Sequence, residues 1–283
     1  MKRTVGIIGA GTMGSGIAQV AALAGFEVLL YDVSAGALKS CMERIRADLR
    51  TAVQKGKGTA ADATDALTRI RPLRAFNDIG GADIVIEAAV EDLAVKKEIF
   101  RALDQVVAPR AILATNTSSL SITSIGSLTK ASESVVGMHF FNPAVQMKLV
   151  EIVRGSQTSD GTVRTIQETA IAMGKTPVSC SDTPGLIVNR VARPFYGEAL
   201  RLLGEGAASA EQIDRIVRLS GGFRMGPFEL MDLIGIDVNY AVTKSVYEQF
   251  FQEPRFRPHP IQRYMVEAGT LGRKTGRGFY PYE

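Results

Sequence analysis

The sequence has 283 residues, of which 46% are hydrophobic and 22% charged, and its net charge is +4. This composition is typical of a globular protein of about two domains and excludes a disordered or collagen-like chain. The basic residues form no tail of the kind that binds nucleic acid, and no apolar run approaches the roughly 18 residues of a membrane-spanning helix. The start of the chain shows no signal peptide, and Cys41 and Cys180 lack the spacing of metal ligands or a disulfide framework. We therefore expect a cytoplasmic protein with no membrane, nucleic-acid or metal partner.

The first 184 residues alternate short β-branched segments with longer helical patterns. Strands are expected at residues 4–8, 27–31, 83–87, 111–114, 135–139 and 149–153. Helices are expected at residues 12–25, 34–55 and 93–106. Strands that alternate with helices indicate βαβ units and a mostly parallel sheet, with ligands at the carboxyl ends of the strands. The sequence therefore predicts an N-terminal α/β domain of the Rossmann type over residues 1–184.

The pattern changes beyond Pro184, where no strand is expected before the last residues. Helices are expected at residues 186–203, 209–220, 237–251 and 260–268. Ser209 is typical of a helix start, and Gly269 is typical of a helix end. These segments predict an all-helical C-terminal domain over residues 185–283.

A glycine-rich turn follows the first expected strand and opens the first expected helix. It reads Gly9-Ala10-Gly11-Thr12-Met13-Gly14. Three glycines can make an ordinary loop, but the flanking strand and helix, together with Asp32 at the end of the second strand, favour a dinucleotide site. The glycines let the backbone approach a pyrophosphate, whose charge the free N–H groups of the helix start bind. Asp32 would hydrogen-bond the ribose and repel a 2′-phosphate, so we expect NAD rather than NADP.

Polar residues also end or follow later strands. The segment Asn116–Ser119 follows the strand at residues 111–114, and by itself it is typical of a turn and helix cap. His139, one of two histidines, ends its strand and is suited to take a hydroxyl proton near pH 7, although a single histidine is more often a core or surface group. Glu151 would lie beside His139 if its strand returned antiparallel, and otherwise it is a strand-edge charge.

Seven segments carry a resemblance to a known family across essentially the whole chain. They are residues 9–14, 116–119, 139–143, 149–151, 184–190, 225–227 and 272–276. With them the sequence resembles the 3-hydroxyacyl-CoA dehydrogenase family, most of all its short bacterial 3-hydroxybutyryl-CoA dehydrogenase members. The resemblance implies NAD-dependent oxidation of an (S)-3-hydroxyacyl-CoA, of short chain such as 3-hydroxybutyryl-CoA, to the 3-ketoacyl-CoA.

The resemblance also implies roles for individual residues. His139 would be the catalytic base and Glu151 its partner, while Ser118 and Asn189 would contact the substrate oxygens. The implied cofactor contacts are Gly9, Ala10, Gly11, Thr12, Met13, Gly14, Asp32, Glu91, Lys96, Asn142 and Lys274. Lys55 matches a lysine that reaches the CoA moiety, and the C-terminal domain would form a homodimer. From the residues alone, Lys55, Lys96 and Lys274 are interpreted as solvated lysines. For Asn189 two partners remain open, a substrate carbonyl or hydroxyl and the neighbouring backbone.

Three alternatives remain open. Arg224 stands where many members have proline, and residues 226–235 resemble members of phenylacetate breakdown, so the substrate would be 3-hydroxyadipyl-CoA. A dehydrogenase of small free β-hydroxy acids shares both halves but typically uses a lysine base, which His139 with Glu151 argues against. A catalytically idle NAD-binding structural protein is the third alternative, since the family includes lens crystallins; an intact set of Ser118, His139, Glu151 and Asn189 argues against it.

Overall fold

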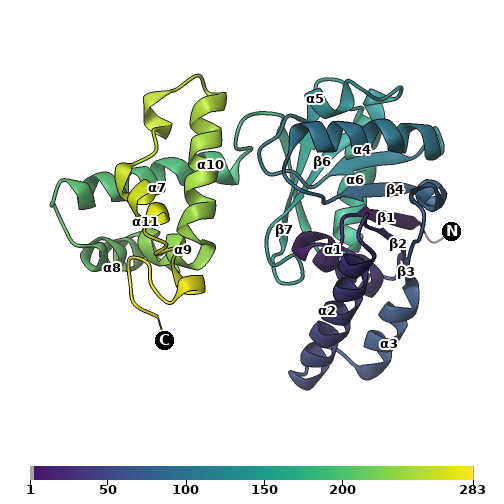
Figure 1. Ribbon diagram of the computed structural model, residues 1–283, viewed down its shortest axis with the longest axis horizontal. Coiled ribbons are helices and arrows are strands. Elements are labelled where there is room, and N and C mark those ends of the chain that lie inside the picture. Colours follow the sequence, from purple (N-terminus) through teal and green to yellow (C-terminus); the bar gives the residue numbers. More distant parts are fainter. Residues whose placement is uncertain (1–2, 283) are drawn as a thin grey trace. The chain divides into compact units, whose positions relative to one another are not determined.

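The computed structural model describes residues 3–282, which fall into two compact units (Figure 1). The break lies between Thr183 and Pro184, one residue before the expected boundary. The first unit is a sheet with helices and the second consists mainly of helices. No helix among the described residues is long and apolar enough to cross a membrane.

Eight strands of the first unit form one sheet in the order β3-β2-β1-β4-β5-β6-β7-β8. They are β1 (Thr4–Ile8), β2 (Glu27–Tyr31), β3 (Ile70–Pro72), β4 (Ile84–Glu87), β5 (Ile112–Thr115), β6 (Val135–Phe140), β7 (Leu149–Arg154) and β8 (Thr176–Ser181). All neighbours run parallel except β6 and β7, so the prediction of a mostly parallel sheet is confirmed. The chain leaves β1 toward β2 and β3 and resumes on the other side of β1 at β4. The carboxyl ends of β1 and β4 are therefore where this topology binds ligands.

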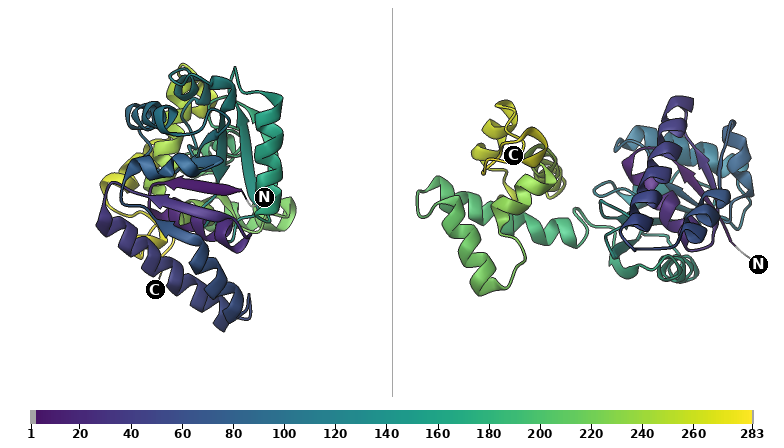
Figure 2. Two further views of the ribbon diagram at one scale, coloured as in Figure 1. Left: turned by 90° about the vertical axis from the view of Figure 1, so that its right-hand side faces the viewer. Right: turned by 90° about the horizontal axis from the view of Figure 1, so that it is seen from below.

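Helices cover both faces of this sheet (Figure 2). They are α1 (Thr12–Leu23), α2 (Ala35–Gln54), α3 (Ala60–Arg69), α4 (Leu93–Val106), α5 (Ile122–Gly126) and α6 (Asp160–Ala172). On one face, Ile7 of β1 belongs to a buried core with Ile17 of α1 and Ile166 of α6. On the other face, a Cβ at Gly137 would meet Ile122 of α5, so this helix lies directly against β6.

Three α-helices and two strands of the first unit lie outside the ranges expected from the sequence: α3, α5, α6, β3 and β8. The helix α3 begins with a capping box between Thr59 and Asp62, which is a start signal that the sequence does contain. The edge strand β8 is largely exposed, with only Pro177 and Cys180 half-buried, and it contains no apolar run of the kind that predicts a buried strand.

The second unit contains α7 (Val188–Gly204), α8 (Ala210–Gly221), α9 (Pro227–Ile234), α10 (Ile236–Gln249) and α11 (Pro260–Glu267). Within residues 184–282 the β-type pairing is limited to isolated bridges at Gly272–Arg277 and Arg277–Pro281, so the prediction of a helical domain is confirmed. Phe228, Met231 and Ile236 lie at the centre of its core. The helix α9 was not expected, although Pro227 occupies its first turn, where proline is favoured.

Two buried carboxylates fasten residues 279–282 to this helical unit. Asp232 of α9 accepts hydrogen bonds from the backbone N–H groups of Phe279 and Tyr280, at 3.0 Å each, and from the Tyr282 hydroxyl at 2.9 Å. Asp214 of α8 accepts the Tyr280 hydroxyl at 2.8 Å. A buried carboxylate needs such donors to compensate for lost hydration, so this segment is part of the unit's interior.

Candidate active site

The glycine turn leaves no room for a side chain at Gly9 or Gly14. Gly9 has a φ of +102°, and a Cβ there would lie 2.6 Å from the Ala88 carbonyl oxygen. A Cβ on Gly14 would overlap the Gly9 carbonyl oxygen, whereas the space beside Gly11 is open within 4 Å. Among the described residues no side chain caps the start of α1, so its first N–H groups are available to an anion. This backbone cradle fits the pyrophosphate of a dinucleotide.

Asp32 ties the end of β2 to the glycine turn. Its Oδ2 accepts the Ala10 N–H at 2.8 Å and its Oδ1 accepts the Ser34 N–H at 2.9 Å. A carboxylate has about four acceptor positions, so capacity remains for ribose hydroxyls. Arg44, which sequence reasoning missed, donates from α2 to the Ala10 carbonyl at 3.1 Å and to Ser15 at 3.2 Å. This guanidinium therefore supports the turn through its backbone.

His139 and Glu151 face each other across the antiparallel pair β6–β7. The His139 Nδ1 lies 2.7 Å from the Glu151 Oε2, and the two side chains are only 8% and 1% exposed. Because Glu151 engages Nδ1, the Nε2 nitrogen is the one left to meet a substrate hydroxyl. The structure thus confirms the expected neighbourhood of these residues at the carboxyl end of β6.

The segment after β5 is held from two sides. The Asn116 side-chain oxygen accepts the Phe140 N–H at 2.8 Å, which joins this segment to β6 one residue after His139. The Glu91 Oε1 accepts the Thr117 hydroxyl at 2.5 Å, the Ser118 N–H at 3.0 Å and the Ser119 hydroxyl at 3.2 Å. Ser118 and Glu91, assigned separately from the resemblance, therefore lie together.

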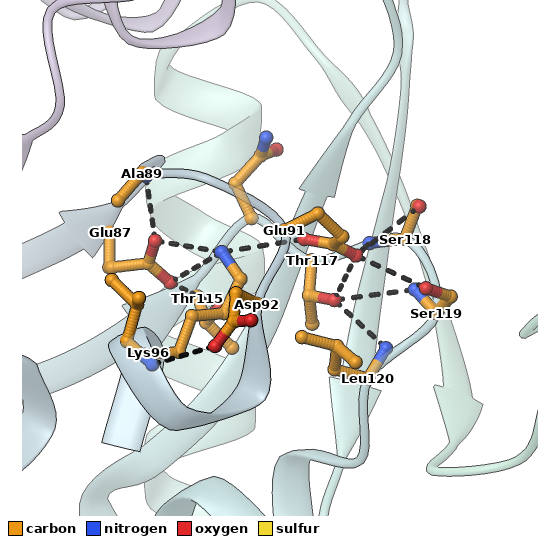
Figure 3. Close-up of polar contacts among 12 residues, drawn as sticks. Glu87, Ala89, Glu91, Asp92, Lys96, Thr115, Thr117, Ser118, Ser119 and Leu120 are labelled. Carbon is orange, nitrogen blue, oxygen red and sulfur yellow. Dashed lines mark hydrogen bonds and ion pairs between the residues drawn. The ribbon is translucent and has the colours of Figure 1, made fainter. Parts of the chain in front are cut away.

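Lys96 is not a solvated lysine, and that part of the sequence interpretation is wrong. Its side chain is 1% exposed, and its Nζ lies 2.8 and 3.0 Å from the two carboxylate oxygens of Glu87 (Figure 3). Its distance to the Glu91 Oε2 is 3.4 Å. Sequence reasoning gave Glu87 no role, yet this fully buried carboxylate at the end of β4 also accepts the Ala89 N–H and the Thr115 hydroxyl.

Two expected site residues lie in the helical unit. Asn189 is in the first turn of α7, and its carbonyl accepts the Arg193 Nε at 3.1 Å. The Lys274 Nζ lies 2.5 and 2.6 Å from the carboxylate oxygens of Asp237. Partial burial acts to raise the pKa of Asp237, but hydrogen bonds from Lys274 and the Val238 N–H outweigh it, so the net pKa is lowered. Lys274 is thus held in an ion pair.

The remaining expected residues are exposed. Lys55 caps the end of α2, about 30 Å along the helix axis from its start beside Asp32. Asn142 follows β6 and Arg224 lies in the turn between α8 and α9. Within residues 3–282 no group of three His, Cys, Asp or Glu side chains could hold a metal ion.

Comparison with known proteins matches both units to one family. Residues 4–183 match the NAD binding domain of 3-hydroxyacyl-CoA dehydrogenase, and residues 185–282 match its C-terminal domain. The 3-hydroxyadipyl-CoA dehydrogenase of Escherichia coli K12 is 51% identical over 99% of this chain, which spans 59% of that protein. The 3-hydroxybutyryl-CoA dehydrogenase of Clostridioides difficile is 43% identical over 98% of both chains. The crystal structure of (S)-3-hydroxybutyryl-CoA dehydrogenase from Ralstonia eutropha superposes with a TM-score of 0.95, at 43% identity over all of both chains.

Proposed function

Because the chain belongs to the 3-hydroxyacyl-CoA dehydrogenase family, whose members are NAD-dependent oxidoreductases, we propose that it oxidises an (S)-3-hydroxyacyl-CoA to the 3-ketoacyl-CoA. The observation that carries this proposal is the buried His139–Glu151 pair, 2.7 Å apart at the carboxyl end of β6. This end of the sheet is also where β1 delivers the glycine turn. A base for the substrate and a cradle for the dinucleotide therefore occupy the same sheet edge.

In the proposed reaction His139 takes the proton of the substrate hydroxyl on Nε2. NAD, when bound at the glycine turn, would accept the hydride, and the carbon that loses it would become the carbonyl carbon of the ketone. Glu151 stabilises the imidazolium that forms and fixes which ring nitrogen faces the alcohol. Ser118 and Asn189 would orient the substrate oxygens, which holds the reacting carbon in a productive geometry.

We assign the main NAD contacts to the glycine turn and Asp32. The glycine turn would hold the pyrophosphate, and Asp32 would accept the ribose hydroxyls. Glu91, Lys96, Asn142 and Lys274 remain proposed contacts, which the family resemblance supports. For Lys96 the burial against Glu87 argues that its contact with NAD is small or made through Glu91.

The acyl group has two candidates. Full-length relatives named 3-hydroxybutyryl-CoA dehydrogenase support the short chain, which we take as the leading substrate. The 51% identity to a 3-hydroxyadipyl-CoA dehydrogenase favours the second candidate, whose terminal carboxylate the exposed Arg224 would accept. Lys55 would contact the CoA moiety, whose length suits a site far along α2.

We also propose that the chain forms a homodimer through its helical unit. Ile216, Leu219 and Phe223 stand about one helical turn apart along and just beyond α8, and they are 62%, 75% and 53% exposed. A monomeric protein rarely leaves such a row of apolar side chains in water. Light scattering on the purified protein should give twice the chain mass, and replacing Leu219 by Glu should halve it.

The reaction is tested by following NADH absorbance with acetoacetyl-CoA, and then with 3-hydroxybutyryl-CoA and 3-hydroxyadipyl-CoA in the oxidation direction. We expect turnover that replacing His139 by Gln abolishes. An inactive wild-type protein that still binds NADH would support the structural, non-catalytic alternative. Activity with free 3-hydroxy acids that exceeds activity with their CoA esters would support the β-hydroxy acid alternative.

A further inference from the structure

A buried ion pair joins Glu87 to Lys96, and the proposed mechanism gives Glu87 no role. Glu87 ends β4 with a side chain that is fully buried, and Lys96 lies on the buried side of α4. Two charges removed from water carry a large desolvation cost, which only close pairing and further hydrogen bonds offset. Such a pair therefore points to a role beyond general stability.

The Glu87 carboxylate is held in one position by its donors. Its Oε1 accepts the Ala89 N–H at 2.7 Å, and its Oε2 accepts the Thr115 hydroxyl at 2.6 Å. Lys96 then donates to both oxygens. The carboxylate therefore has hydrogen bonds to β5 and to the backbone after β4. Held in this way, it fixes the position of the Lys96 ammonium group (Figure 3).

Lys96 in turn reaches Glu91, a loop residue whose side chain is 39% exposed. The ammonium group lies 3.4 Å from the Glu91 Oε2, while the other oxygen, Oε1, faces the segment Thr117–Ser119. The two oxygens of Glu91 are thus divided between Lys96 and this segment. Thr117 links Glu91 to the next residues of the segment, because its hydroxyl oxygen accepts the N–H groups of Ser119 and Leu120 at 3.3 and 2.9 Å.

We propose that Glu87 is a positioning residue that acts through Lys96 to hold Glu91 against the Thr117–Ser119 segment, and so sets the place of Ser118. The catalytic consequence rests on the proposed function, in which Ser118 contacts the substrate oxygen. Without the Glu87 charge, Glu91 is the counter-charge nearest to Lys96. The ammonium group then draws the Glu91 carboxylate away from the Thr117–Ser119 donors.

The test replaces Glu87 by Gln, which keeps the shape and removes the charge. The matched control is Glu98→Gln, the same substitution at an exposed position of α4. Hydrogen exchange of the full chain, measured by mass spectrometry, should show faster exchange over residues 117–120 in Glu87→Gln and no change there in Glu98→Gln. This measurement needs no turnover, so it tests the connection even if the proposed reaction is absent. Unchanged exchange over residues 117–120 would overturn the inference.

Kinetics then separate positioning from general stability. Loss of a charge-assisted hydrogen bond predicts a fall in kcat of about 10-fold or more for Glu87→Gln. In a Ser118→Ala background the same substitution should lower kcat by less than about twofold, because the group it positions is gone. Equal factors in the two backgrounds would refute the inference and leave Glu87 as a structural residue. If Glu87→Gln does not fold, Glu87→Asp takes its place, because it keeps the charge but shortens the side chain. This variant should show the same faster exchange over residues 117–120 and the same coupling to Ser118→Ala, both in weaker form. A Glu87→Asp protein without these two effects would likewise refute the inference.

Discussion

Replacing Glu151 by Gln changes the charge beside His139 while keeping the side-chain shape. In the wild type the Nδ1–Oε2 distance is 2.7 Å and both groups are buried, so solvent screens their interaction little. Oxidation of the alcohol turns a neutral imidazole into an imidazolium. The carboxylate therefore stabilises the transition state more than the ground state, which is the requirement for catalysis.

The magnitude follows from the geometry. Two unit charges centred about 4 Å apart interact by about 4 kcal/mol at an effective dielectric constant of about 20. If the imidazole carries about two thirds of its final charge in the transition state, the loss is about 2.7 kcal/mol. This energy corresponds to a fall in the oxidation rate of about 10².

The assay is kcat/KM for oxidation of 3-hydroxybutyryl-CoA, measured for the wild type and for Glu151→Gln at the same pH. NADH affinity should stay near the wild-type value, because the glycine turn lies on β1, three strands away from β6. Glu168→Gln, at an exposed position of α6, is the matched control. A Glu151→Gln enzyme with a near-normal oxidation rate would refute this reasoning.

Three further predictions concern other parts of the chain. Asp32→Ala should raise the KM for NAD and narrow the preference over NADP, and a wild type that uses both cofactors equally would contradict the role of Asp32. Arg224→Ala should lower kcat/KM for 3-hydroxyadipyl-CoA more than for 3-hydroxybutyryl-CoA, and equal losses would remove Arg224 from acyl recognition. Burial, followed by the charges of Glu151 and Asp182, raises the pKa of Cys180 to about 12, so iodoacetamide should label it far more slowly than free cysteine at about pH 8; labelling at the rate of free cysteine would show that the thiolate forms readily.

The local parts of the site could be predicted from the sequence because their signals are short in range. The glycine turn needs only its flanking strand and helix, and both appear at Thr4–Ile8 and Thr12–Leu23. The pairing of His139 with Glu151 needs only one antiparallel return between neighbouring strands. Their opposition in the register then follows from the strand geometry.

The burial of Lys96 could have been predicted from the spacing of apolar residues on its helix, but an interpretation from charge alone overlooked it. Phe100 and Leu103, four and seven residues further along α4, are buried. This spacing places Lys96 on the buried stripe of the helix, and a lysine there requires an anion nearby. Which anion it meets could not be predicted, because Glu87 comes from a strand and the contact depends on how β4 and α4 pack. The contact of Arg44 with the glycine turn depends on tertiary packing in the same way.

The fastening of residues 279–282 by Asp232 and Asp214 has a consequence for synthesis of the protein. These contacts join residues 47 to 66 positions apart in the chain. During translation, Asp232 and Asp214 are made well before Tyr280 and Tyr282, and the ribosome adds about 5–20 residues per second. Until residues 279–282 leave the ribosome, Asp232 lacks the donors of Phe279, Tyr280 and Tyr282. Asp214 lacks the Tyr280 hydroxyl and has only the N–H groups of Phe228 and Glu229 from α9. The sheet unit can fold while the chain is still growing, whereas the helical unit completes its interior only after this late segment has emerged.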